Sequence, residues 1–109
     1  MTKYFKEIDD GNMNQEFLLK LDRAREVAQI PFKINSAYRS PEHNAKIGGK
    51  PNSSHLKGLA VDISVTDSRS RFIVLKALIE AGFNRIGVAD TFIHVDDDKS
   101  KSPEVVWTY

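Results

Sequence analysis

Residues 59–65 alternate between apolar and small or polar side chains, and this alternation constrains the fold more than any other feature of the chain. The odd positions hold the apolar side chains, namely Leu59, Val61, Ile63 and Val65. Successive side chains of a β-strand point to opposite faces, so the segment predicts a strand with one face in the core. A register slip of one residue would bury Asp62 and expose the apolar set. We therefore expect Asp62 on the face that points away from the core.

Four other segments have the pattern of strands: residues 32–37, 85–89, 91–97 and 104–109. The second and third of these lie on either side of Asp90 and predict a hairpin. Within residues 91–97 the apolar positions that would face the core are Ile93 and Val95. The opposite face then carries Phe92, His94 and Asp96.

Two longer segments predict amphipathic helices. In residues 14–29 the apolar positions recur at helical spacing, with Asn12 or Asn14 as the N-cap. In residues 68–81 we expect Gly82 to end the helix. The side chains predicted to face inward are Phe17, Leu21, Ala24 and Ala28 in the first helix, and Phe72, Leu75, Leu78 and Ile79 in the second. A short helix is also expected over residues 41–47.

These elements predict an α+β domain, with a mainly antiparallel sheet that has helices packed on one face and a polar site on its open face. With 109 residues, 40% of them hydrophobic, the chain fits one domain over residues 1–109, in which residues 1–11 form an N-terminal arm. The net charge of +1 and the mixing of lysines with acids argue against a nucleic-acid partner. No stretch is long and apolar enough for a membrane span, and we expect a monomer.

The chain contains no cysteine, so any metal must be bound by imidazole and carboxylate. His55 precedes Asp62 by seven positions, and Gly58 between them allows a tight backbone passage. His94 is expected on the same face of the sheet as Asp62. Two imidazoles and one carboxylate suit zinc and leave a fourth coordination position open, as in catalytic sites.

The segments SAYRSPEHNAKIGGKPNSSHLKGLAVDIS and IGVADTFIHVDDD resemble the M15 peptidases, the group of D-alanyl-D-alanine carboxypeptidases and phage endolysins with a hedgehog-like zinc fold. The resemblance extends over roughly residues 12–109. It implies that His55, Asp62 and His94 bind one Zn²⁺ ion. It also implies that Arg39 receives a carboxylate of the substrate, for which the planar guanidinium is suited because it can donate two parallel hydrogen bonds.

The reaction implied by the resemblance is hydrolysis of an amide by water activated on zinc, with a nearby carboxylate as general base. Many relatives have an acidic residue three positions before the last histidine, or a histidine two before it, where this chain has Thr91 and Phe92. We favour Asp96 as the base because it shares the strand face of His94, with Asp90 as the alternative. Ser53 is a further candidate for contact with the substrate.

The expected function is therefore cleavage of peptidoglycan stem peptides, of the D-Ala-D-Ala carboxypeptidase or the L,D-endopeptidase type. The alternative is a non-catalytic, zinc-stabilised module that binds peptidoglycan, for instance within a phage particle. Action at the bacterial cell wall or periplasm is expected. The N-terminal sequence MTKYFKEIDD lacks the apolar region of a signal peptide, which favours phage-encoded cytoplasmic synthesis with holin-type release.

Overall fold

The computed structural model describes residues 2–109, so Met1 of the expected arm lies outside it. Five strands form one sheet in the order β1-β2-β4-β3-β5. All neighbouring strands are antiparallel except β3 and β5, which are parallel. The strands are β1 (Ile34–Ser36), β2 (Ala60–Ser64), β3 (Arg85–Val88), β4 (Phe92–Asp96) and β5 (Val105–Thr108).

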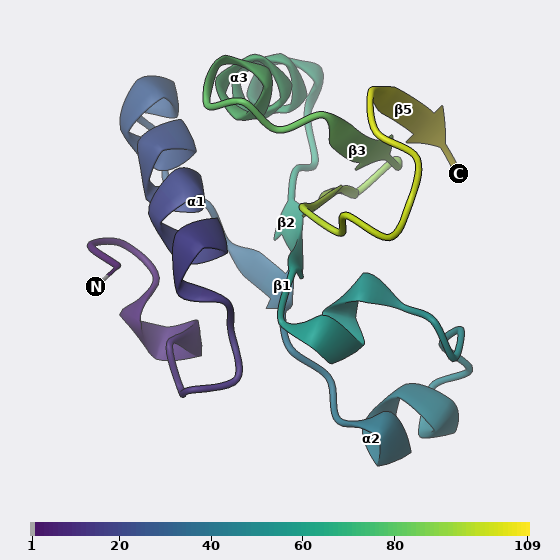
Figure 1. Cartoon of the computed structure of the whole chain (residues 1–109). Helices are drawn as coiled ribbons and strands as arrows, with labels where there is room; N and C mark the ends of the chain where they lie inside the picture. The colour runs from purple at the N-terminus through teal and green to yellow at the C-terminus, as the bar shows by residue number, and fades with distance from the viewer. Residues whose placement is uncertain (1) are drawn as a thin grey trace.

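Two long helices, α1 (Gln15–Ala28) and α3 (Ser68–Glu80), pack on the apolar side of the sheet. Figure 1 shows α2 (Pro41–Lys46) at the far end of the molecule from α3. The 3₁₀ helices are η1 (Lys6–Ile8) and η2 (Ser54–Lys57). The predicted α+β class with a mainly antiparallel sheet is confirmed. Within residues 2–109, no helix has the length and apolar character needed to cross a membrane.

Helix α1 forms where the sequence predicts it. The side chain of Asn14 accepts a hydrogen bond from the backbone N–H of Phe17, which selects Asn14 over Asn12 as the N-cap. At the other end, Gln29 adopts a left-handed conformation and its N–H bonds the carbonyl of Arg25. The buried face of α1 consists of Phe17, Leu18, Leu21 and Ala24.

Helix α3 is partly rotated relative to the prediction. Leu78 is buried and Leu75 packs against the core, as expected, but the other two predicted residues are exposed. Phe72 and Ile79, expected to face inward, are 64% and 53% exposed. The buried residues are Val74, Ala77 and Leu78. Both stripes are apolar at helical spacing, so periodicity alone could not choose between them. The small side chain of Ala77 is among the buried ones, which allows α3 to pack closely against its neighbours.

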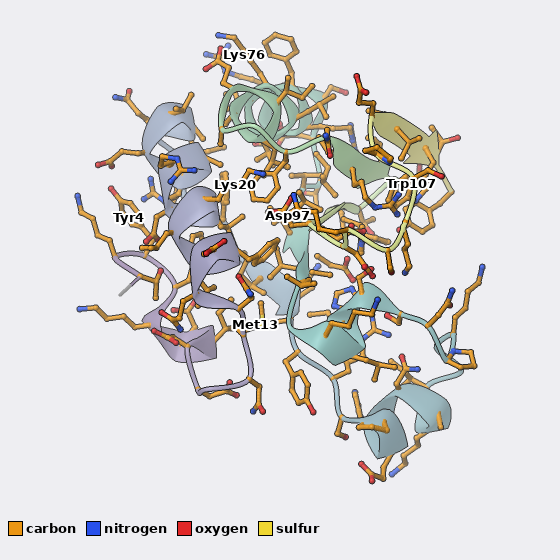
Figure 2. All side chains as sticks on the ribbon, viewed as in Figure 1. Tyr4, Met13, Lys20, Lys76, Asp97 and Trp107 are labelled. Carbon is orange, nitrogen blue, oxygen red and sulfur yellow. The ribbon has the colours of Figure 1, made fainter. Side chains whose placement is uncertain are left out.

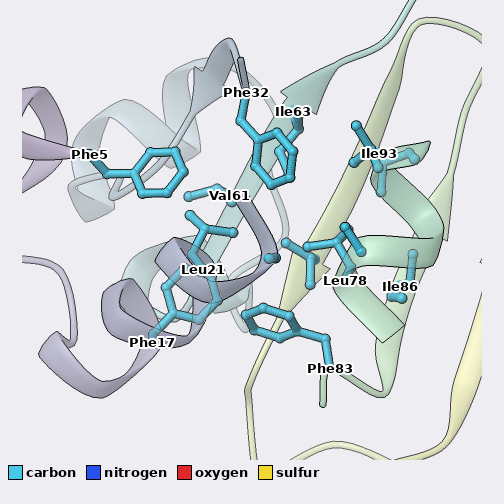
Figure 3. Packing of buried hydrophobic residues seen from close by; sticks show 14 of the residues in the cluster. Phe5, Phe17, Leu21, Phe32, Val61, Ile63, Leu78, Phe83, Ile86 and Ile93 are labelled. Atoms are coloured by element: carbon cyan, nitrogen blue, oxygen red, sulfur yellow. The ribbon is translucent and has the colours of Figure 1, made fainter. Parts of the chain in front are cut away.

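The sheet has the side-chain facing predicted from alternation. Val61, Ile63, Ile93 and Val95 are fully buried on the helix side. They pack with aromatic side chains from the helices and loops, among them Phe17, Phe32 and Phe83 (Figure 3). In the register of β2 with β4, Asp62 lies opposite His94, so the two side chains share the other face of the sheet.

The segment before α1 packs against the domain. Asp22 of α1 accepts hydrogen bonds from the Thr2 hydroxyl and from the backbone N–H groups of Lys3 and Tyr4. Phe5 is buried in the core, next to Phe32 (Figure 3). These contacts hold residues 2–5 against the helix and the core.

A buried carboxylate ties η2 to the end of β4. Asp98 accepts hydrogen bonds from the Ser54 hydroxyl and from the ammonium of Lys57, both of which belong to η2. Burial alone would raise the pKa of Asp98, but hydrogen bonds from Ser100, Ser54 and Lys57 hold that pKa well below its ordinary value. This cluster fixes η2, which carries His55, against the sheet.

Replacing Asp98 by asparagine is expected to lower the free energy of unfolding at pH 7 by about 1–3 kcal/mol, the cost of buried donors left without an ionised partner. A carboxylate with a lowered pKa stabilises the fold above its unfolded pKa of about 3.9, and that stability disappears as the pH falls. The difference between wild type and Asp98→Asn should therefore shrink below about pH 4. Urea unfolding at pH 7 and pH 3 measures it, and an equal difference at both pH values would contradict the assignment.

Candidate metal centre

His55 is held in a fixed orientation by the backbone around it. It lies in η2, where the Ser53 hydroxyl accepts a hydrogen bond from the His55 N–H as the N-cap. The ring nitrogen Nδ1 lies 2.7 Å from the carbonyl oxygen of Ala37, a distance at which Nδ1–H donates to that carbonyl. This tautomer leaves Nε2 with a free lone pair. Nε2 lies 3.4 Å from Oδ1 of Asp62.

His94 presents its other nitrogen to the same carboxylate. Its Nδ1 lies 3.0 Å from Oδ1 of Asp62, and its Nε2 lies 2.7 Å from Oδ2 of Asp96. Asp96 therefore accepts a hydrogen bond from the Nε2–H of His94. This leaves Nδ1, which faces Asp62, with the lone pair that can bind a metal. The two histidines thus use opposite ring nitrogens, and each is oriented by a hydrogen bond from the nitrogen that points away.

The three candidate ligand atoms meet the requirements of a zinc site. One atom each from His55, Asp62 and His94 lie within 4.8 Å of one another. Tetrahedral zinc with bonds of about 2.1 Å separates its donors by about 3.4 Å. Asp62 Oδ1 lies 3.4 Å from Nε2 of His55 and 3.0 Å from Nδ1 of His94, which is close to that spacing. In zinc sites, the second ring nitrogen of a ligand histidine donates a hydrogen bond to an outer partner, which orients the ring. Both histidines of this centre are oriented in this way.

The charges at this centre are strongly coupled. Burial alone would raise the pKa of Asp62, but its contacts with the imidazoles of His55 and His94 hold that pKa far below its ordinary value. Burial alone would lower the pKa of His94, but Asp62 and Asp96 raise it above its ordinary value. The carboxylate of Asp62 therefore stays ionised. Its negative charge favours a cation beside it, either a protonated histidine or a metal ion.

Asp96 is enclosed by its partners. Its side chain is 1% exposed. Oδ1 accepts a hydrogen bond of 2.7 Å from Nε of Arg85 and another from the backbone N–H of Asp98. Oδ2 is engaged by His94. Burial raises the pKa of Asp96, but His94 and Arg85 outweigh burial and lower it. These contacts are those of a residue that orients His94.

Trp107 of β5 closes one side of the centre. The centroid of its ring lies 5.5 Å from the centroid of the His94 ring. The guanidinium carbon of Arg85 lies 5.1 Å from the centroid of the Trp107 ring, as in a cation–π contact. Figure 2 shows Trp107 on the side of the sheet away from α1. Gly87 permits this packing, because a Cβ at that position would lie 2.5 Å from Nε1 of Trp107. Gly87 also pairs with His94 in the sheet register, so Trp107 occupies the space beside His94 that a side chain at position 87 would fill.

A cavity of about 350 Å³ lies beside the centre and includes His55 and His94 in its wall. Arg39, predicted to receive a carboxylate, also lines it. Its Nη1 donates to Asn44 Oδ1, whereas its Nε is buried and has no hydrogen-bond partner among residues 2–109. An orphaned buried donor in a cavity wall indicates a place for an acceptor from a ligand. Ser53 lines the same cavity and caps η2 there.

A family model described as Peptidase M15 matches residues 1–96. The chain belongs to the peptidase M15 family. Family membership supports a zinc-dependent peptidase, and the cluster of His55, Asp62 and His94 supplies residues that fit the metal. A search of curated proteins finds no match to the chain.

The two candidate bases of this M15 chain lie in different surroundings. Asp96 lines the cavity, and both its oxygens are engaged as described above. Asp90 is exposed in the turn between β3 and β4, where its backbone carbonyl accepts a hydrogen bond from Arg71. Asp90 does not line the cavity. The identity of the base stays a prediction, and the geometry favours an orienting role for Asp96.

Sequence reasoning did not single out Arg85, Lys101 or Tyr109, all of which line the cavity. Arg85 could have been found from strand alternation, because it lies two residues from Gly87 on the strand face that meets His94. Lys101 lies in the loop after β4, and Tyr109 follows β5. Neither residue has a local sequence signal for the site. Tyr109 reaches it only because β5 pairs in parallel with β3.

Proposed function

We propose that this chain is a zinc metallopeptidase that hydrolyses peptide bonds in bacterial peptidoglycan stem peptides, as a D-Ala-D-Ala carboxypeptidase or an L,D-endopeptidase. One observation supports the proposal above all others. In a chain of the M15 family, three metal-ligand atoms lie within 4.8 Å of one another, beside a cavity that contains Arg39. The site of action in this proposal is the bacterial cell wall or periplasm.

Zinc, when bound, activates water for attack and polarises the scissile carbonyl. The residues of the chain would hold the metal and orient the groups that bind it. His55 and His94 offer nitrogens whose directions are fixed by the Ala37 carbonyl and by Asp96. Trp107 restricts the access of solvent to one side of His94. The ligands are thus arranged before the substrate arrives, which lowers the cost of reorganisation during reaction.

Arg39 positions the substrate in this proposal. Its guanidinium is anchored at one end by Asn44, and the N–H groups that are not bonded to Asn44 are proposed to bind a substrate carboxylate. A terminal carboxylate bound at Arg39 would place the last peptide bond next to the metal ligands, as a carboxypeptidase requires. Ser53, at the same wall, is the second residue proposed to contact the peptide.

The second candidate function is a non-catalytic, zinc-stabilised module that binds peptidoglycan, for instance in a phage particle. One observation favours it. Asp96 is the only carboxylate among the described residues that line the cavity, and both its oxygens are already engaged. To serve as general base, Oδ2 would have to release His94. A module that only binds peptidoglycan does not require Oδ2 of Asp96 to release His94.

Mass spectrometry of purified muropeptides incubated with zinc-loaded protein tests the two functions. We expect loss of one alanine from a carboxypeptidase and a cut stem from an endopeptidase. Arg39→Lys, which keeps the charge but removes the planar fork, should raise KM more than it lowers kcat if Arg39 contributes binding. Intact muropeptides together with measurable binding would refute the enzyme and support the binding module.

A further inference from the structure

Cationic side chains outnumber carboxylates in the wall of the cavity. Four of its lining residues are Arg39, Lys50, Arg85 and Lys101. Among the described residues, the one carboxylate in the wall is Asp96, which is engaged by Arg85 and His94. The whole chain has a net charge of only +1, so this surplus is local. A cavity lined by one sign of charge concentrates ligands of the opposite sign.

Lys101 is only weakly paired. Its ammonium lies 3.7 Å from Oδ2 of Asp98 and 2.9 Å from the Ser54 hydroxyl. Lys57 lies closer to the same carboxylate, at 3.0 Å from both oxygens. Lys57 therefore neutralises most of the charge of Asp98. Of these two lysines, Lys101 alone lines the cavity, where it retains positive charge for a ligand.

Arg39 and Lys50 add further unmatched charge. The Nε of Arg39 is buried without a hydrogen-bond partner, and neither residue forms an ion pair with any other part of residues 2–109. Lys50 is exposed at the rim. After one carboxylate has been bound by Arg39, the ammonium of Lys50 remains without an anion, and that of Lys101 has only the Asp98 carboxylate that it shares with Lys57.

We propose that the cavity recognises a peptide with two carboxylates, one received by Arg39 and the second by Lys101 with Lys50. This inference rests on the proposed function and specifies the substrate class: an acidic peptide with a free terminal carboxylate and a side-chain carboxylate near it. The pairing suits the donors. The fork of Arg39 fixes the orientation of one carboxylate, whereas the flexible lysines accept the other at variable geometry.

The test compares two tripeptides, acetyl-Ala-Glu-Ala and acetyl-Ala-Gln-Ala, which share the terminal carboxylate and differ by one side-chain charge. Binding to the zinc-loaded protein is followed by fluorescence of Trp107, the single tryptophan of the chain and part of the cavity wall. We expect the wild type to bind the glutamate peptide about tenfold more tightly, as a hydrogen bond between charged groups allows. The preference should fall as the salt concentration rises.

The variants Lys101→Met and Lys50→Met should each reduce the glutamate preference, because binding of the glutamate peptide weakens more than binding of the glutamine peptide. Lys76→Met is the control, because it also removes one positive charge, pairs with Glu80 on α3 and does not line the cavity. It should keep the full preference. Equal binding of the two peptides by the wild type would overturn the proposal, as would an equal loss of preference in Lys76→Met and Lys101→Met.

The experiment separates this inference from the proposed function because it measures binding rather than turnover. Intact muropeptides with a retained glutamate preference would refute the enzyme and support the second carboxylate site. Cleaved muropeptides without a glutamate preference would support the enzyme and refute that site.

Discussion

His55→Ala and His94→Ala are each expected to bind zinc more than about 100-fold more weakly than the wild type. Each variant removes one of three candidate ligands, and loss of an outer partner alone costs about 10–100-fold in metal affinity. After dialysis, either variant should therefore contain less than one equivalent of zinc by elemental analysis. Competition with a chromophoric chelator measures the affinity itself. Any cleavage of muropeptides by the wild type should disappear with the metal.

The chain offers a matched control in its third histidine. His43 lies exposed on α2 and does not line the cavity. His43→Ala should keep a full equivalent of zinc and an unchanged affinity. A full equivalent in His55→Ala or His94→Ala would refute the assigned ligands.

Asp96→Asn is expected to weaken zinc binding by about 10–100-fold, because the amide cannot hold the Nε2–H of His94 and the guanidinium of Arg85 as the carboxylate does. It should also lower the free energy of unfolding of the zinc-free protein by about 3–5 kcal/mol, the cost of breaking a buried ion pair and leaving Arg85 unmatched. Chelator competition and urea unfolding measure the two effects. If Asp96 acted only as the general base, zinc affinity would be unchanged and turnover alone would be lost.

The neighbouring Asp97 supplies the control for Asp96. Its carboxylate pairs with Lys20 of α1 at 3.2 Å, away from the ligands (Figure 2). Asp97→Asn should change stability by no more than about 1 kcal/mol, as for a partly exposed ion pair, and leave zinc affinity unchanged. A loss of zinc affinity in Asp97→Asn equal to that in Asp96→Asn would mean that the effect comes from the net charge of the loop.

The facing of the ligands was predictable because strand alternation leaves one choice. Burying Val61 and Ile63 places Asp62 on the other face, and the same argument applies to His94 in β4. The rotation of α3 was not predictable in this way. Its two stripes are both apolar, so the stripe with Phe72 and the stripe with Val74 satisfy the same helical period.

The outer parts of the site could not be predicted because they depend on pairings between distant segments. Trp107 reaches His94 only through the parallel contact of β5 with β3. Ala37 meets His55 through backbone geometry. Arg85 is the exception, because strand alternation in the predicted hairpin places it on the face of His94, where it bonds Asp96. A parallel neighbour has no short-range sequence signal comparable to a hairpin turn. The resemblance to M15 peptidases supplied Arg39, which spacing alone would not have indicated.

The strand order separates two tasks within one small domain. Asp62 and His94 belong to β2 and β4, neighbouring strands with pairing on both sides. Apart from His55, His94 and the orienting Asp96, the cavity wall comes largely from the loops on either side of α2, the loop after β4 and the C-terminal segment with the edge strand β5. Substitutions in the wall can therefore change which peptide fits while the ligand geometry stays intact. This arrangement makes the wall, rather than the strands that carry the ligands, the natural target for redesign of specificity.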